Sequence, residues 1–107
     1  MFIQHNANKI YSVRFVNKEK GLDVTIPVRG DEYIFDAAEI EGIELPASCR
    51  AGACISCTGK VVKGEVDSDE IFLKRHEEEA GFLLTCKCYA MSDCVIETHQ
   101  QDALLDL

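Results

Sequence analysis

Three cysteines within nine residues constrain this chain more than any other feature of its sequence. Cys49, Cys54 and Cys57 lie in the stretch CRAGACISC with the spacing C-x4-C-x2-C, and Cys86 follows later in the chain. Such thiols can belong to a disulfide framework, to a structural zinc site or to an iron–sulfur cluster. The first question for this chain is therefore what these thiols hold.

The amino-terminal sequence argues against a disulfide framework. Six cysteines in 107 residues would suit a small secreted scaffold, but the opening MFIQHNANK has no apolar h-region and no small-residue cleavage site. We therefore expect the thiols to be reduced and the protein not to be secreted. No apolar run approaches the roughly 18–20 residues that cross a bilayer. We expect no membrane insertion, and we expect a cytoplasmic location or a stroma-equivalent compartment.

A zinc site and an iron–sulfur cluster remain as alternatives. Zinc usually takes thiolates as two short-spaced pairs, and Cys86 with Cys88 in the stretch CKC can supply the second pair. The spacing of Cys49, Cys54 and Cys57, with Cys86 as a fourth thiolate, is the plant-type 2Fe-2S spacing. Zinc does not account for the small residues of the loop, so the sequence favours one 2Fe-2S cluster.

The residues between and beside these cysteines suit a cluster. Gly52 and Ala53 are small, and Gly52 can take backbone angles that let the chain wrap tightly and aim N–H groups at sulfur. Arg50 adds a positive charge beside an anionic cluster. Hydroxyls adjacent to the ligands can bond a sulfur or brace the loop, or they are only exposed polar residues; they belong to Ser48, Ser56 and Thr85.

Two further cysteines are interpreted as core residues. Cys88 and Cys94 lie in apolar stretches, where a thiol more often behaves as a small buried hydrophobe than as a ligand. If CKC is extended, however, Cys86 and Cys88 face the same side. Cys88 is then the one plausible substitute ligand.

The hydrophobic periodicity predicts an α+β domain. Tyr11, Val13 and Phe15 alternate with polar residues, as do Leu22 to Val28 after a glycine-bearing turn, which predicts a hairpin with one buried face. Pro27 then belongs near a strand end or on an unpaired side. The stretch DEYIFDAAEIEG changes to a helical period, with Ile34, Ala37, Ala38 and Glu41 on one stripe and Tyr33, Ala37 and Ile40 on another. Gly42 is the expected stop. The runs KVVKGEV, FLLTC and CVIET predict further short strands.

The net charge of −8 argues against nucleic acid as a ligand, because phosphate binding needs clustered lysine and arginine. It favours a basic partner protein, although a solvated surface is an equal alternative. The charge is uneven: Lys9, Arg14, Lys18 and Lys20 precede a stretch with Asp31, Glu32, Asp36, Glu39, Glu41 and Glu44. Such a dipole can orient a partner on approach.

Taken together, these stretches resemble the plant-type ferredoxins of oxygenic photosynthesis. The resemblance runs from DEYIFDAAE through LPASCRAGACISCTGKVVKGEVD to GFLLTC and DCVIETH. It implies a β-grasp (ubiquitin-like) fold with a mixed sheet, one main helix and a cluster-binding loop. It also implies a one-electron carrier, not an enzyme, in which Cys49 and Cys54 hold the iron nearer the surface and Cys57 and Cys86 the inner one.

The same resemblance implies partners and a docking face. The expected partners are basic redox proteins: a reductase, photosystem I or a ferredoxin-dependent enzyme. Residues expected to dock them are Asp67, Asp69, Glu70, Phe72 and Gln101. We expect residues 1–107 to form one ferredoxin domain, with 1–8 as a short extension, and the protein to be a monomer.

The chain departs from the family pattern at several positions. Ala47 stands where the family usually has an aromatic residue, and Lys87 where it has an apolar one, so we expect a displaced reduction potential, with Lys87 favouring the reduced state. Lys74, Arg75 and His76 interrupt a commonly acidic helix, and Gln101 replaces a glutamate used with ferredoxin–NADP reductase. These departures predict a divergent paralogue that docks poorly on that reductase and serves a narrower partner. A redox-sensing or structural cluster module, and an electron-supply component of an oxygenase, remain alternatives.

Overall fold

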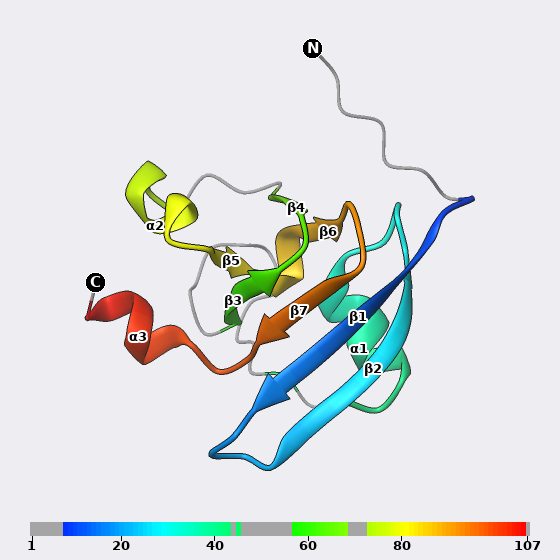
Figure 1. Ribbon diagram of the computed structural model, residues 1–107, viewed down its shortest axis with the longest axis horizontal. Coiled ribbons are helices and arrows are strands. Elements are labelled where there is room, and N and C mark those ends of the chain that lie inside the picture. The colour runs from blue at the N-terminus through cyan, green and yellow to red at the C-terminus, as the bar shows by residue number, and fades with distance from the viewer. Residues whose placement is uncertain (1–7, 44, 46–56, 69–72, 107) are drawn as a thin grey trace.

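The computed structural model describes residues 8–43, 45, 57–68 and 73–106 (Figure 1). The strands are β1 Ile10–Asn17, β2 Leu22–Arg29, β3 Thr58–Lys63, β4 Val66–Ser68, β5 Phe82–Leu84, β6 Cys88–Ala90 and β7 Cys94–Glu97. The helical segments are α1 Ile34–Ile40, α2 Arg75–Glu79, α3 Gln101–Leu105 and a 3-10 turn, η1, at Thr85–Lys87. Within the described residues, no helix is both long and apolar enough to cross a bilayer.

The predicted hairpin is confirmed. Strands β1 and β2 pair antiparallel along their whole lengths, from Ile10 opposite Arg29 to Asn17 opposite Leu22. Their alternating apolar residues face the interior, because side chains alternate between the two faces of a strand. Pro27 is exposed on β2, which is an outer strand of the sheet. A proline is tolerated there because an outer strand has one unpaired edge.

The strands form a mixed sheet with α1 packed on one face. The five-stranded sheet has the order β2-β1-β7-β3-β5, in which β1 and β7 are parallel and the other neighbours antiparallel. Strands β4 and β6 make a separate pair. Helix α1 contacts β2, η1 and β6 and crosses the sheet (Figure 1). This arrangement confirms the predicted α+β, β-grasp fold.

Helix α1 ends where the sequence predicted. Gly42 has a φ of 79°, and the amides of Gly42 and Ile43 donate to the carbonyls of Glu39 and Ala38, which closes the last turn. The predicted stripe through Ile40 is wrong, because Ile40 is 78% exposed. It lies two residues after buried Ala38, about 200° around the helix. Phe35 is buried instead.

The run KVVKGEV is not one strand. Strand β3 ends at Lys63 and β4 begins at Val66. The strand is interrupted at Gly64, which has a φ of 95°. The run FLLTC is a strand only as far as Leu84, where η1 begins. Glycine can adopt backbone conformations that other residues adopt only with strain. The strand predicted through Gly64 was therefore too long.

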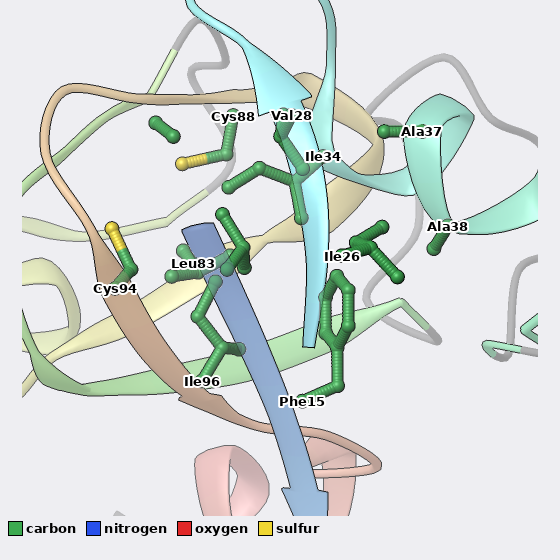
Figure 2. Packing of buried hydrophobic residues seen from close by; sticks show 12 residues of the cluster. Phe15, Ile26, Val28, Ile34, Ala37, Ala38, Leu83, Cys88, Cys94 and Ile96 are labelled. Carbon is green, nitrogen blue, oxygen red and sulfur yellow. The ribbon is translucent and has the colours of Figure 1, made fainter. Parts of the chain in front are cut away.

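Two apolar clusters fill the interior. The larger, shown in Figure 2, joins the sheet to α1 and contains Val13, Phe15, Ile26, Val28, Ile34, Ala37, Ala38, Leu83, Cys88, Ala90, Cys94 and Ile96. The smaller one, called here the thiol-side cluster, contains Phe35, Cys57, Leu73, Phe82, Leu84, Cys86 and Leu104. Two of the four motif cysteines therefore lie in an apolar region separate from the main core.

Candidate metal centre

The register of two strands brings Cys57 and Cys86 together. Strand β3 begins at Thr58, which is opposite Leu84, the last residue of β5. The strands are antiparallel, so the residue before β3 and the residues after β5 emerge at the same end of the ladder. As a result, two cysteines far apart in the sequence have their Sγ atoms 3.0 Å apart.

This thiol pair is buried and braced. Cys57 is 2% exposed and Cys86 is 4% exposed. The Thr85 hydroxyl donates to the Cys57 carbonyl at 2.9 Å, and the Thr85 amide donates to the same oxygen at 3.3 Å. Thr85 therefore braces the backbone next to both sulfurs, one of the two roles expected for it.

The pair suits a soft metal centre. A disulfide bond is about 2.05 Å long, so sulfurs 3.0 Å apart are not joined, and the structure has both residues as thiols. Two thiols in one apolar region are a donor set that favours iron–sulfur clusters or zinc. No three metal-binding side chains converge within the ranges that the structure describes.

The remaining loop residues lie outside the described residues. This applies to Cys49 and Cys54, to Ala47, and to the loop positions predicted to contact the cluster, which are Ser48, Arg50, Gly52, Ala53 and Ser56. The docking residues Asp69, Glu70 and Phe72 also lie outside them. Their predicted roles stay predictions.

Cys88 is separated from the thiol pair. The segment Thr85–Lys87 is a 3-10 turn, so Cys86 and Cys88 do not follow the period of two of an extended chain. Cys88 is fully buried in the main core, with its sulfur 4.0 Å from the Ser68 hydroxyl. Its interpretation as a small core residue is therefore the one the structure favours.

Cys94 is a second core thiol. It is 3% exposed, and its sulfur contacts the carbonyls of Ser92 and Glu65 at 3.0 and 3.2 Å. Burial raises the pKa of the Cys94 thiol, which keeps it protonated and poorly reactive. Figure 2 shows the sulfur-bearing side chains of Cys88 and Cys94 in the same part of the main core.

Sequence reasoning missed the partners of Lys87. The Lys87 ammonium lies over the Tyr33 ring, 4.9 Å from its centroid, and Tyr33 stacks on Tyr89 with centroids 4.6 Å apart. Tyr33 precedes α1 and Tyr89 lies in β6. The residue types can be read from the sequence. Their meeting cannot, because it depends on the β-bridge between the backbones of Tyr33 and Tyr89.

The described docking residues lie at two places. Asp67 is half-buried in β4, and Gln101 is the first residue of α3. Helix α3 contacts β3, and the acidic helix α2 contacts β5, so both helices lie beside the two strands that flank the thiol pair. In Figure 1 they lie together on the left of the view.

An open pocket of about 400 Å³ lies between the hairpin tip and α3. His99, at its wall, is half-buried and has a φ of 58°. A 2.7 Å hydrogen bond joins its Nδ1 to the hydroxyl of buried Thr98. Burial, and then the charge of Lys20, lower the pKa of His99.

Comparison with known proteins supports the interpretation of the site. Residues 17–91 match the family model of the 2Fe-2S iron–sulfur cluster binding domain. The vegetative ferredoxin of Trichormus variabilis is 49% identical over 96 residues, which cover 89% of this chain and 97% of that protein. Ferredoxin-6, chloroplastic, of Zea mays is 41% identical over 104 residues, or 96% of this chain and 66% of that protein.

Solved structures agree with the sequence relatives. The structure of pectocin M2 superposes with a TM-score of 0.82 and 42% identity, over 90% of this chain. This chain spans 35% of pectocin M2. The chain therefore belongs to the plant-type 2Fe-2S ferredoxin family, whose members carry electrons on one such cluster and are not enzymes.

Proposed function

We propose that this ferredoxin passes electrons one at a time from photosystem I or a reductase to ferredoxin-dependent enzymes. Its cluster is held by Cys49, Cys54, Cys57 and Cys86, in a single domain spanning 1–107. The observation that carries the proposal is the buried thiol pair, with sulfurs 3.0 Å apart in an apolar cluster. Family membership supplies the identity of the cofactor.

The protein contributes position and environment to this transfer. When bound, the cluster supplies reversible storage of one electron at a potential tuned by hydrogen bonds and solvent exposure. Cys57 and Cys86 supply two thiolates, and Thr85 fixes the backbone between them. Apolar neighbours such as Phe82 and Leu84 keep water from the inner sulfurs. In the same proposal, Ser48, Arg50, Gly52, Ala53 and Ser56 surround the outer thiolates.

We propose that a basic partner docks beside the thiol pair. Helices α2 and α3 flank that region and carry acidic residues, including Glu77 to Glu79 and Asp102. Asp67, Asp69, Glu70 and Phe72 belong to the same proposed face. The distribution of charge favours encounter with a positively charged surface near the cluster.

The cluster is tested by counting iron and acid-labile sulfide on anaerobically purified protein, with low-temperature EPR before and after dithionite. We expect two irons and two sulfides for each chain, a silent oxidised state and a rhombic signal on reduction. Cys57→Ser should lose most of the cluster, whereas Cys88→Ala, its control in a buried cysteine, should keep it.

Two results would contradict the proposed site. Zinc in place of iron would leave a structural site and remove electron transfer from the proposal. Cluster loss in Cys88→Ala together with a loaded Cys57→Ser variant would show that the ligand set is wrong. Apparent unfolding of either variant is checked by circular dichroism.

Partner choice is tested at Gln101. We propose that this residue weakens docking on ferredoxin–NADP reductase, because the family carries a glutamate there and a carboxylate attracts a basic surface. Gln101→Glu should then raise the rate of electron transfer with that reductase several-fold, on the scale of an ion pair of about 1 kcal/mol. Ala103→Glu adds the same charge at an exposed position of α3 and serves as control. Equal rates for wild type and Gln101→Glu would remove the argument for a narrower partner.

An oxygenase partner is the second candidate. The observation that favours it is a likeness to the ferredoxin reductase in carbazole 1,9a-dioxygenase, with a TM-score of 0.66 and 26% identity over 84% of this chain. This chain spans 28% of that protein. A reduced sample mixed with an oxygenase component should be reoxidised with product formed, whereas a photosynthetic carrier should fail in that assay.

A further inference from the structure

Lys87 lies next to a proposed cluster ligand in a position that the fold fixes. It is the last residue of η1, directly after Cys86, and its side chain is half-buried. Neighbouring Cα atoms are about 3.8 Å apart, so the lysine stem starts close to the thiol pair. A half-buried ammonium is less screened by solvent and salt than an exposed one.

One tyrosine contacts this ammonium, and a second tyrosine stacks on the first. The Lys87 Nζ atom is 4.9 Å from the centroid of the Tyr33 ring, within the range of a cation–π contact, and 3.5 Å from the Tyr33 hydroxyl. At 3.5 Å the hydroxyl contact is weak as a hydrogen bond, so the ring is the main partner. The ring in turn stacks on Tyr89 at 4.6 Å with an interplanar angle of 29°.

The tyrosine pair is itself anchored at both backbones. Tyr33 and Tyr89 form an antiparallel bridge, which connects the start of α1 to β6. The side chain of Lys87 is therefore held against Tyr33, whose own position is fixed by Tyr89. A flexible lysine on an open surface would spread its charge over many positions, whereas this one is restricted.

No carboxylate of the residues that the structure describes forms an ion pair with Lys87. Ion pairs in this part of the chain join Arg14 with Asp23, Arg29 with Asp31 and Arg75 with Glu79. A cation without a carboxylate partner interacts with any negative charge that develops nearby. Reduction of a cluster adds one negative charge to the site.

We infer that Lys87 sets the reduction potential of this ferredoxin, with Tyr33 and Tyr89 as positioning residues that hold its ammonium beside the site. The inference rests on the proposed cluster function. It adds that the contact with Tyr33 holds the Lys87 charge in one position. The pinned ammonium stabilises the reduced form and raises the potential. The tyrosines act only through the lysine.

The experiment is a redox titration of the loaded protein, monitored by visible absorption, at two ionic strengths. Lys87→Met keeps the length of the side chain but removes the charge, and should shift the potential to a more negative value. Lys87→Arg keeps both the charge and the contact with the ring, and should leave it unchanged. Tyr33→Leu should shift it in the negative direction by less than Lys87→Met, because the freed ammonium moves into solvent.

The control is Lys20→Met, which removes the same charge from the exposed hairpin tip and should leave the potential unchanged. Higher salt should shrink the difference between wild type and Lys87→Met. A potential unchanged in Lys87→Met, or shifted equally in Lys20→Met, overturns the inference. So does a Tyr33→Leu variant with the wild-type potential, since the lysine would then need no positioning.

Failure of this inference is distinct from failure of the proposed function. Iron, sulfide and the EPR signal of the wild type decide the function before any variant is titrated. If Lys87→Met does not retain its cluster, Lys87→Gln and Tyr33→Leu carry the test with the same expected direction. A variant is titrated only if its iron content matches that of the wild type.

Discussion

At the scale of single residues, His99 couples the stability of the fold to pH. Burial, followed by the charge of Lys20, lowers the pKa of His99 below its usual value near 6.5. The unfolded chain then binds a proton at a pH where the folded protein does not. The free energy of unfolding is therefore highest above about pH 6.5, and it falls as the pH drops below that value.

We expect His99→Asn to flatten this dependence. Asparagine tolerates the left-handed backbone that His99 adopts at a φ of 58°, and it does not titrate. The apparent denaturation midpoint, followed by circular dichroism from about pH 7 to pH 5, should fall less in the variant than in wild type. Lys20→Met removes the second cause of the shift and should give an intermediate slope. Parallel curves for all three proteins would show that His99 is not the titrating group.

At the scale of elements, the turn between β3 and β4 depends on Gly64. A Cβ atom there would overlap the Asp93 carbonyl oxygen and lie 2.9 Å from the Cys94 Cα, and the φ of 95° is itself costly for other residues. Gly64→Ala should lower the free energy of unfolding by more than the ~1–3 kcal/mol of backbone strain alone. Its control is Gly21→Ala, with a φ of 64° but open space around its Cα. Equal losses of stability of the two variants in denaturant would mean that the Asp93 carbonyl moves aside at no cost.

The same elements show what the sequence could predict. The hairpin, the helix stop at Gly42 and the burial of Cys88 followed from local periods and residue types, since these are properties of neighbouring residues. The meeting of Cys57 with Cys86 required the register of β3 on β5, and the contact of Lys87 with Tyr33 required the bridge to Tyr89. Such tertiary pairings are not encoded in any single window of sequence.

At the scale of the whole molecule, the charge asymmetry seen along the sequence partly cancels in space. Arg14 pairs with Asp23 at 2.7 Å on the neighbouring strand, and Arg29 pairs with Asp31 at 3.0 Å. The molecule extends 37 × 35 × 25 Å, several times the Debye length of about 8 Å at physiological ionic strength. A partner in contact therefore responds mainly to the face that it meets, and less to the net charge of −8.

Because the Debye length is short compared with the molecule, the carboxylates nearest the docked partner should control association. If partners dock beside α2 and α3, then Glu78→Gln on α2 should slow electron transfer with ferredoxin–NADP reductase at low salt and flatten its decline as salt is added. Glu41→Gln removes the same charge from an exposed position at the end of α1, a helix that contacts β2, η1 and β6. It should leave the rate and its salt dependence near those of wild type. Electron transfer that does not respond to salt would argue against electrostatic docking altogether. Equal effects of both substitutions would mean that the net charge guides the encounter and that the α2 face does not.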